Sequence, residues 1–415
     1  MKRPLLVGLL ILTNLSLVHA SEWPRFRGIN GSGVNENAEI PVEWTDKDIL
    51  FDVELPGTGN GSPVVHGKRV FLLCADEETF ERMPVCLDAQ SGEILWQDKV
   101  QTGKFKGHRF NSPASSTAAV DDEQVYFSWG TKEELTIAAY THDGERVWSR
   151  GLGPVVGGHG FGASPAVYEE LVVINNDQDK ANGSLIALNK ATGKTEWEID
   201  RNGERLSYST PCEVSVGGKT FLVFTNWQHG FTVVDPANGD VVDELSPFDL
   251  TTNERAISSP IAFGDIVVGT CGFTANPKHC VAVRVDEKGK LEEIWRIERS
   301  VPHIPSPLLV GDLLFLWDDK GILTCVDPMT GEEHYRERVP TRGTCFGSPV
   351  SDGKTIFSID DGGNVHAVAA SKEFKVLGMT ALKDVCRSTP AIANGNLYLR
   401  TNTRLVAIKG KAVTG

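Results

Sequence analysis

The sequence lacks several features that would assign a function directly. After its first 20 residues it has no apolar run near the 20 or so residues that cross a membrane. It has no Cys-x-x-Cys pair, which is the spacing of many structural zinc sites. It has no positive excess, since 41 Lys and Arg stand against 55 Asp and Glu, giving a net charge of −14. That balance disfavours nucleic acid and anionic membrane surfaces as partners.

The first 20 residues predict a secretory signal peptide. Lys2 and Arg3 supply a basic start, Leu5 to Val18 an apolar core, and His19-Ala20 the end of a cleavage site with small residues. No Cys follows the cleavage site, so we expect no lipid anchor there. We therefore expect a periplasmic or secreted protein without a transmembrane segment.

About eight copies of one sequence phrase make up most of the chain. A copy opens with a small residue and Pro, continues into an apolar β-branched run, and closes with a turn containing Gly and then an aromatic. In one copy these are Ser164-Pro165, Leu171 to Ile174, Gly193 and Trp197. The second residues of the openings are Pro63, Ala118, Pro165, Pro211, Pro260, Pro307, Pro349 and Pro390, 41 to 55 residues apart. This period predicts an all-β fold, an eight-bladed β-propeller of four-stranded antiparallel sheets.

The last copy ends without its closing strand, and the missing strand is found near the N-terminus. Residues 49–55 resemble the outer strand of the first full copy, residues 94–100, and have no copy of their own. We expect residues 49–55 to complete the last blade and close the ring. The predicted divisions are a signal at 1–20, an N-terminal extension at 21–48, the propeller at 49–410 and a tail at 411–415.

The repeated Gly and aromatic residues predict how neighbouring blades meet. A tight hairpin before the outer strand requires positive φ, which Gly adopts without strain. We expect the aromatic residues that follow to fill the space between blades; they include Trp96, Trp148, Trp197 and Trp295.

Eight cysteines in an exported chain suggest disulfides. The candidate pairs are Cys74–Cys86 and Cys271–Cys280 within single blades, and Cys345–Cys386 between adjacent blades. Free buried thiols are the alternative. Cys212 and Cys325 have no evident partner.

Basic and imidazole side chains precede nearly every opening, where the chain should enter one mouth of the central channel. A convergent basic mouth would attract an anion, and the guanidinium fork suits carboxylate or phosphate. The alternative is that nearby acids such as Glu204, Glu254 and Asp384 neutralise these residues. The seven candidate ligand-binding residues are Arg109, His159, Arg205, Arg255, His303, Arg342 and Arg387.

Acidic pairs in loops have two interpretations. Asp177 and Asp179 present spaced oxygen atoms that could bind calcium, or they belong to a polar turn. Asp318-Asp319 and Asp360-Asp361 are expected to be turn residues. No catalytic triad, phosphate loop or metal site can be assigned from spacing, so we assign no catalytic and no metal-binding residue.

Leu87 to Trp96, echoed at Ala187 to Trp197, resembles the repeat of propellers of the pyrroloquinoline-quinone (PQQ) type. Trp23 to Gly28, followed by Gly31 and Gly33, resembles an exported bacterial subgroup called PQQ-like or BamB-like, and Ser207 to Pro211 fits that subgroup. BamB-like members are scaffolds that bind other proteins. Quinoprotein dehydrogenases of the broader group hold PQQ with calcium over the channel, often beside a disulfide between adjacent cysteines.

This chain has no adjacent Cys pair and no Cys-x-x-Cys-His haem site. We therefore interpret it as an exported, non-catalytic binding or scaffold protein of the PQQ-like group that binds a protein or an anionic small molecule, with no cofactor required. The alternative is a PQQ- and calcium-dependent quinoprotein oxidoreductase, with the basic mouth holding the quinone carboxylates.

Overall fold

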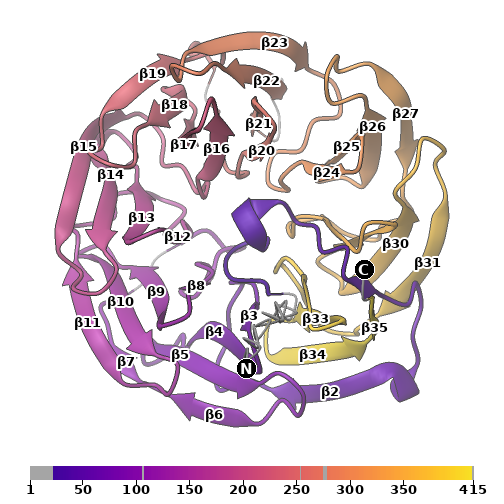
Figure 1. Ribbon diagram of the computed structural model, residues 1–415. Helices are drawn as coiled ribbons and strands as arrows, with labels where there is room; N and C mark the ends of the chain where they lie inside the picture. The colour runs from indigo at the N-terminus through magenta and orange to yellow at the C-terminus, as the bar shows by residue number, and fades with distance from the viewer. Residues whose placement is uncertain (1–21, 105–106, 253, 274–277, 414–415) are drawn as a thin grey trace, which may run out of the picture.

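Eight antiparallel sheets surround a central axis as the blades of a propeller (Figure 1). The computed structural model describes residues 22–104, 107–252, 254–273 and 278–413. The predicted eight-bladed fold is confirmed. The signal predicted at residues 1–20 lies outside the described residues. No helix in the described part of the chain is long and apolar enough to span a membrane.

The blades follow one another in chain order, and each runs outward from an innermost strand. Blades 1 to 4 are β3 (Val64–His66), β4 (Arg69–Ala75), β5 (Glu81–Asp88) and β6 (Ile94–Gln97), with β7 (Val100–Gln101) also paired to β5; β8 (Ala119–Val120), β9 (Gln124–Gly130), β10 (Leu135–Thr141) and β11 (Arg146–Gly151); β12 (Ala166–Tyr168), β13 (Leu171–Asn176), β14 (Ala181–Asn189) and β15 (Thr195–Gly203); and β16 (Cys212–Val216), β17 (Lys219–Asn226), β18 (Gly230–Val234) and β19 (Val241–Leu245). Blades 5 to 8 are β20 (Ile261–Phe263), β21 (Ile266–Cys271), β22 (His279–Val285) and β23 (Leu291–Ile297); β24 (Leu308–Val310), β25 (Leu313–Trp317), β26 (Ile322–Val326) and β27 (Glu333–Arg338); β28 (Val350–Ser351), β29 (Thr355–Ile359), β30 (Asn364–Ala369) and β31 (Val376–Ala381); and β32 (Ala391–Ala393), β33 (Asn396–Arg400), β34 (Arg404–Lys409) and β2 (Ile49–Glu54).

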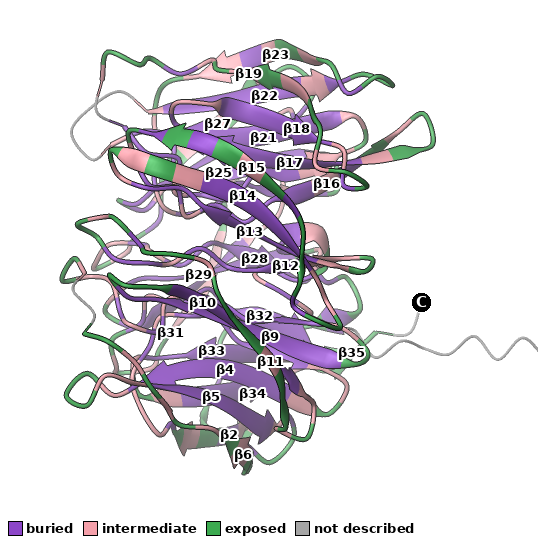
Figure 2. Ribbon diagram, turned by 90° about the vertical axis from the view of Figure 1, so that its left-hand side faces the viewer, coloured by how far each residue is buried: buried purple, intermediate pink, exposed green. Residues whose placement is uncertain are grey.

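Every innermost strand begins one residue after a predicted opening. β12 follows Pro165 and β24 follows Pro307, positions where the N–H that Pro lacks is not needed by the strand ladder. The middle strands are buried on both faces, as the apolar runs predict. The outer strands are largely exposed, and Figure 2 shows this gradient from the middle strands to the rim.

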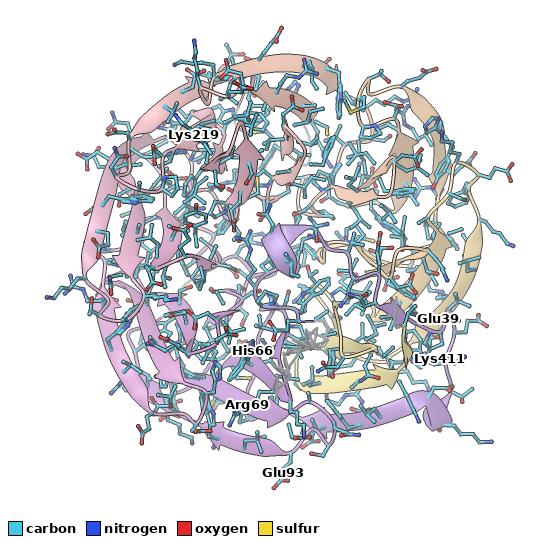
Figure 3. The ribbon with its side chains drawn as sticks, in the orientation of Figure 1. Glu39, His66, Arg69, Glu93, Lys219 and Lys411 are labelled. Atoms are coloured by element: carbon cyan, nitrogen blue, oxygen red, sulfur yellow. The ribbon has the colours of Figure 1, made fainter. Side chains whose placement is uncertain are left out.

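The N-terminal strand closes the ring, as predicted. β2 pairs antiparallel with β34, and Phe51, Asp52 and Val53 face Ala407, Val406 and Leu405 in register. A second link follows, in which β1 (Ala38–Glu39) pairs with β35 (Lys411–Ala412). Glu39 and Lys411 are partners in this register (Figure 3). The chain ends are therefore joined by two antiparallel pairs, and blade 8 has its full set of four strands.

An aromatic residue of one blade packs on a turn glycine of the next. Gly144 has φ 93°, and a Cβ there would lie 2.8 Å from the Trp96 ring, so only glycine fits. The indole of Trp96 then donates its Nε1–H to the carbonyl of His142, at 2.8 Å. The same contact recurs for Trp148 on Gly193, Trp197 on Gly239 and Trp295 on Gly331, each with an indole hydrogen bond into the next blade. The Trp residues therefore lie between the blades, as the sequence predicts.

Blade 8 makes this contact with different residues. Phe51 of β2 packs on Gly92, where a Cβ would lie 2.7 Å from its ring. Phenylalanine has no N–H to donate, and the Tyr398 hydroxyl instead donates to the carbonyl of Ala89 at 3.0 Å. The closing strand thus supplies the aromatic surface, and β33 of the same blade supplies the hydrogen bond.

A ring of side-chain hydroxyls joins the blades near the axis. The backbone N–H of one opening donates to the hydroxyl of the opening in the next blade, as from Ser62 to Thr117 at 2.9 Å. Such bonds are present at seven junctions: 62 to 117, 117 to 164, 210 to 259, 259 to 306, 306 to 348, 348 to 389, and 389 back to 62. We call Ser62, Thr117, Ser164, Thr210, Ser259, Ser306, Ser348 and Thr389 the hydroxyl ring.

The N-terminal segment covers one end of the central channel. The 3₁₀ helix η1 (Ile29–Gly31) lies over the middle of the ring (Figure 1), and a second one, η2 (Asp46–Asp48), precedes β2. Arg25 donates to the carbonyl of Pro211 at 2.5 Å, and Asn30 is bonded to the backbone of Glu213. Residue Val34 bridges to Ser351 in blade 7. This segment therefore contacts blades on different sides of the axis.

The predicted disulfides are wrong, because the eight cysteines are all buried as free thiols. Cys74 faces Met83 across the β4–β5 ladder, while Cys86 faces Phe71. Side chains alternate between the two faces of a sheet, so this odd offset sends Cys74 and Cys86 to opposite faces.

The other two pairs fail for related reasons. Cys271 faces His279 while Cys280 faces Thr270, which again places the two thiols on opposite faces of the sheet. Cys345 packs in the core between blades 6 and 7, and Cys386 in the core of blades 8 and 1. The Cys386 thiol donates to the carbonyl of Arg400 at 2.9 Å.

Phe51→Ala should destabilise the fold by about 3 kcal/mol, the usual range for loss of a buried phenyl ring. The reason is that Phe51 is the aromatic contact at the closing junction. Urea unfolding measures the effect, and Glu54→Ala, an exposed position on the same strand, is the matched control. Equal stability of the two variants would contradict closure of the ring through β2.

Thiol titration in denaturant without reductant should find eight free thiols per chain. Register parity predicts free thiols for Cys74, Cys86, Cys271 and Cys280, and the packing of Cys345 and Cys386 in different cores predicts them for that pair. A count of six or fewer would show a disulfide and contradict this placement of the cysteines.

Candidate functional site

A cavity of about 560 Å³ occupies the central channel between the loops of the mouth and the N-terminal segment. The mouth is formed by the segments that lead into the innermost strands. Five of the seven predicted residues line the cavity, namely Arg109, His159, Arg255, His303 and Arg387. Arg205 and Arg342 are not in its lining. The sequence thus predicts the location of most of these side chains, while their binding of an anion stays a prediction.

Two arginines of the mouth lie against aromatic rings. The Arg109 guanidinium carbon is 4.5 Å from the centre of the Phe110 ring, and that of Arg387 is 5.2 Å from the same ring. Arg387 is also 5.7 Å from Phe346, whose ring centre is 5.1 Å from that of Phe110. Neither guanidinium forms an ion pair with any acid in the described part of the chain. Both positive charges are therefore held by stacking and remain available to an anion.

Arg255 is different, because it is already neutralised. Its two terminal nitrogens donate to the two carboxylate oxygens of Asp179 at 2.9 and 3.1 Å. Burial alone would raise the pKa of Asp179, but the bonds from Arg255 and from the Leu206 amide outweigh burial and lower it. The alternative interpretation of the sequence is that Glu204, Glu254 and Asp384 neutralise the basic residues of the mouth. The acid found at Arg255 is Asp179, while Asp384 is near Arg404 and Glu254 faces His279.

The imidazoles of His108 and His159 stack, with ring centres 5.1 Å apart. Burial lowers the pKa of His159, and the nearby charges of Arg255 and His108 lower it further. His159 is therefore neutral near pH 7. The stacked pair adds a flat polar surface beside Arg255.

His303 is buried in the wall of the mouth, with 6% of its surface exposed. Neither ring nitrogen has a hydrogen-bond partner among the described residues. Burial lowers its pKa to about 4, against the attraction of Asp319. Asp319 accepts the backbone N–H groups of His303 and Ile304 and pairs with Lys278, which fixes this loop. His303 thus presents one unused donor and one unused acceptor to the cavity.

Phe110 and Phe346 were not predicted to be part of the site. Phe346 lies two residues before the opening at Ser348 and Phe110 seven residues before the opening at Thr117, within the segments that carry the basic residues. An aromatic near an Arg in these segments is the signal that could have identified them. Asp319 was predicted as a turn residue, and it is a turn residue that also supports the wall of the cavity.

The described residues do not fit a calcium–quinone site. Asp177 is buried and paired with Arg201 at 3.1 Å, and Asp179 with Arg255, so neither carboxylate is free to bind a cation. Within the described ranges, no group of three or more His, Cys, Asp or Glu is placed to hold a metal ion. The two aspartates are therefore ion-pair residues of a buried loop.

A second cavity, of about 410 Å³, lies between blades 3 and 4. Its lining includes Lys219, labelled in Figure 3, together with Glu196 and Trp197. Trp197 here makes the contact with the next blade described above. This cavity is a gap beside that contact and gathers no unpaired buried group.

The family model described as outer membrane protein assembly factor BamB matches residues 81–337, more than half of the chain. A search of curated protein sequences finds no match. The structure of BamB from Moraxella catarrhalis is similar with a TM-score of 0.63 and 12% identity, over 88% of this chain and 98% of that one.

Other solved structures share the fold at similar distance. A europium-containing methanol dehydrogenase has a TM-score of 0.56 and 11% identity, over 94% of this chain and 90% of that one. A computationally designed protein, Ika8, has a TM-score of 0.59 and 12% identity, over 86% and 98%. An assembly factor, an enzyme and a designed protein thus share this architecture, so the fold alone does not select a function.

Stability should fall between pH 6.5 and pH 4 because of His303. The unfolded imidazole takes up a proton near its ordinary pKa of 6.5 and the folded one near 4, so the unfolded state binds more protons in this window. The full effect is on the order of 3 kcal/mol. Urea unfolding at pH 4.5 and 7.5 should show a smaller pH dependence for His303→Gln than for the unaltered protein. An equal pH dependence would contradict this account of His303.

Proposed function

This chain belongs to the PQQ_2 family, described as outer membrane protein assembly factor BamB, and we propose that it is an exported, non-catalytic binding or scaffold protein. In this proposal the mouth of the central cavity holds a carboxylate or phosphate group of a small molecule or of a partner protein. The export step rests on the signal predicted at residues 1–20.

One observation carries the proposal. Arg109 and Arg387 both lie against the Phe110 ring at the mouth and have no acidic partner in the described part of the chain. The Nε–H of Arg387 is buried without a hydrogen-bond acceptor. A buried unpaired donor on a cation costs free energy unless a ligand accepts it. In a chain of net charge −14, two unpaired cations at a cavity mouth favour an anion there.

The oxidoreductase alternative is supported by the fold shared with a methanol dehydrogenase and by nothing further at the site. Its calcium would need carboxylates, and those of Asp177 and Asp179 are already paired. A binding function needs only the cavity and the unpaired donors, both of which the chain supplies.

Replacing Arg109 and Arg387 together by Ala should weaken binding of citrate and of a hexaglutamate peptide at least about tenfold. Hydrogen bonds to charged groups contribute about 1.5–3 kcal/mol each, and about 1.4 kcal/mol corresponds to tenfold. Isothermal titration measures the affinity, which should also fall as salt rises from about 0.1 M to about 1 M, because screening shortens from about 10 Å to about 3 Å.

The matched control is the double change of Arg146 and Arg150 to Ala, two exposed residues of β11 that alter net charge equally. If this control loses as much affinity as the mouth variant, the attraction is non-specific and the proposed site is wrong. A separate titration with PQQ and calcium distinguishes the alternative: a bound chromophore with dye reduction would contradict a non-catalytic role.

A further inference from the structure

The hydroxyl ring lines the cavity beneath the mouth, and its protons are unused. All eight of its side chains are part of the cavity wall. A hydroxyl has one donor proton and two acceptor lone pairs. At seven junctions one lone pair accepts a backbone N–H from the neighbouring blade, as at Ser306, where the bond from Ser259 is 3.0 Å. The ring hydroxyls therefore use their oxygen atoms as acceptors for backbone N–H groups, and their protons remain available as donors.

No acceptor in the described part of the chain takes the proton of a ring hydroxyl. Other hydroxyls near the axis behave differently: Ser116 bonds to Ser128, and Ser207 donates to the carbonyl of Thr225. Buried hydroxyl protons are almost always satisfied in folded proteins. The groups that satisfy those of the ring must therefore come from the cavity itself, as water or as oxygen atoms of a ligand.

The two layers of the cavity differ in chemistry. The upper layer offers cations and flat aromatic faces, from Arg109, Arg387, Phe110 and Phe346. The lower layer offers hydroxyls that each donate one hydrogen bond and keep one lone pair. A volume of about 560 Å³ is in the usual range for a small-molecule site.

We infer that the ligand is an acidic carbohydrate, such as a sugar carboxylate, with its acid at Arg109 and Arg387 and its hydroxyl groups on the hydroxyl ring. This inference rests on the proposed function, since it takes the mouth to be an anion site. Sugar hydroxyls both donate and accept, and so match ring hydroxyls that retain a donor and a lone pair. The C–H face of a sugar ring packs on the exposed faces of Phe110 and Phe346.

A simple anion matches this cavity less well. Acetate or phosphate satisfies the guanidinium groups but leaves the ring protons to water. A neutral sugar satisfies the ring but leaves Arg109 and Arg387 unpaired. Only a ligand with both an acid and several hydroxyls uses both layers.

The test is isothermal titration of the full mature chain with D-glucuronate, D-galacturonate, D-glucose, acetate and inorganic phosphate. At least one of the two sugar acids should bind at least about tenfold more tightly than glucose and acetate. Thr210→Val should then weaken sugar-acid binding by about threefold to tenfold, the usual effect of one lost hydrogen bond, and leave acetate binding unchanged.

Thr210 suits this substitution because its hydroxyl is not the acceptor in any of the seven junction bonds. Removing this hydroxyl therefore leaves all seven bonds intact. Thr195→Val, at an exposed position of β15, is the matched control, and thermal unfolding should show that both variants remain folded. As a second variant, Ser306→Thr retains the hydroxyl and adds a methyl group to the wall, and it should also weaken sugar-acid binding.

The outcomes separate the two proposals. If acetate or phosphate binds as tightly as both sugar acids, and Thr210→Val changes nothing, the mouth is an anion site but the carbohydrate inference is wrong. If glucose binds as well as glucuronate and galacturonate, the acid has no role at the mouth and both proposals are wrong. If none of the five compounds binds, both proposals are wrong as well.

Discussion

The whole arrangement depends on pairing of the two ends of the chain. Each blade has apolar faces that it cannot cover alone, so every blade needs a neighbour on both sides. β2 brings Phe51 and Val53 into register with Ala407 and Leu405, about 350 residues later in the chain. Because this pairing completes blade 8, it also creates the surface on which Gly92 of blade 1 packs. Without it, blades 1 and 8 would expose the core that they share.

Closure has a consequence for the site, because a closed ring brings the same sequence position of every blade to the same end of the channel. The residues before the openings meet at the mouth, and the openings themselves form the hydroxyl ring. The backbone bonds between successive ring hydroxyls hold the blades in register around the axis. A feature that supports the fold therefore also determines the lining of the cavity.

The sequence predicted the parts of this structure that repeat. The eight openings, the turn glycines and the Trp residues recur at corresponding places in successive copies of the repeat, so the pattern of one copy predicts the others. The closing strand could be predicted because residues 49–55 resemble an outer strand and had no blade of their own. The cysteine pairs could not be predicted in this way, since Cys74 and Cys86 differ by one step of register parity, which sends them to opposite faces.

The site was predicted less completely than the fold. Arg109 and Arg387 were identified by type and position, but Arg342 precedes an opening in the same way and does not line the cavity. The pairing of Arg255 with Asp179 joins residues 76 positions apart, and sequence spacing does not encode such a contact. Phe110 and Phe346 lie at different distances from their openings, so no repeated position in the sequence marks them.

The central claim is that the mouth of the cavity is an anion site, and anomalous diffraction from a crystal soaked in selenate tests it most directly. The account predicts a selenium peak within hydrogen-bond distance of the Arg109 and Arg387 guanidinium groups, which is lost when both are changed to Ala. A fully occupied selenate elsewhere on the molecule, with no peak in the cavity, would contradict it.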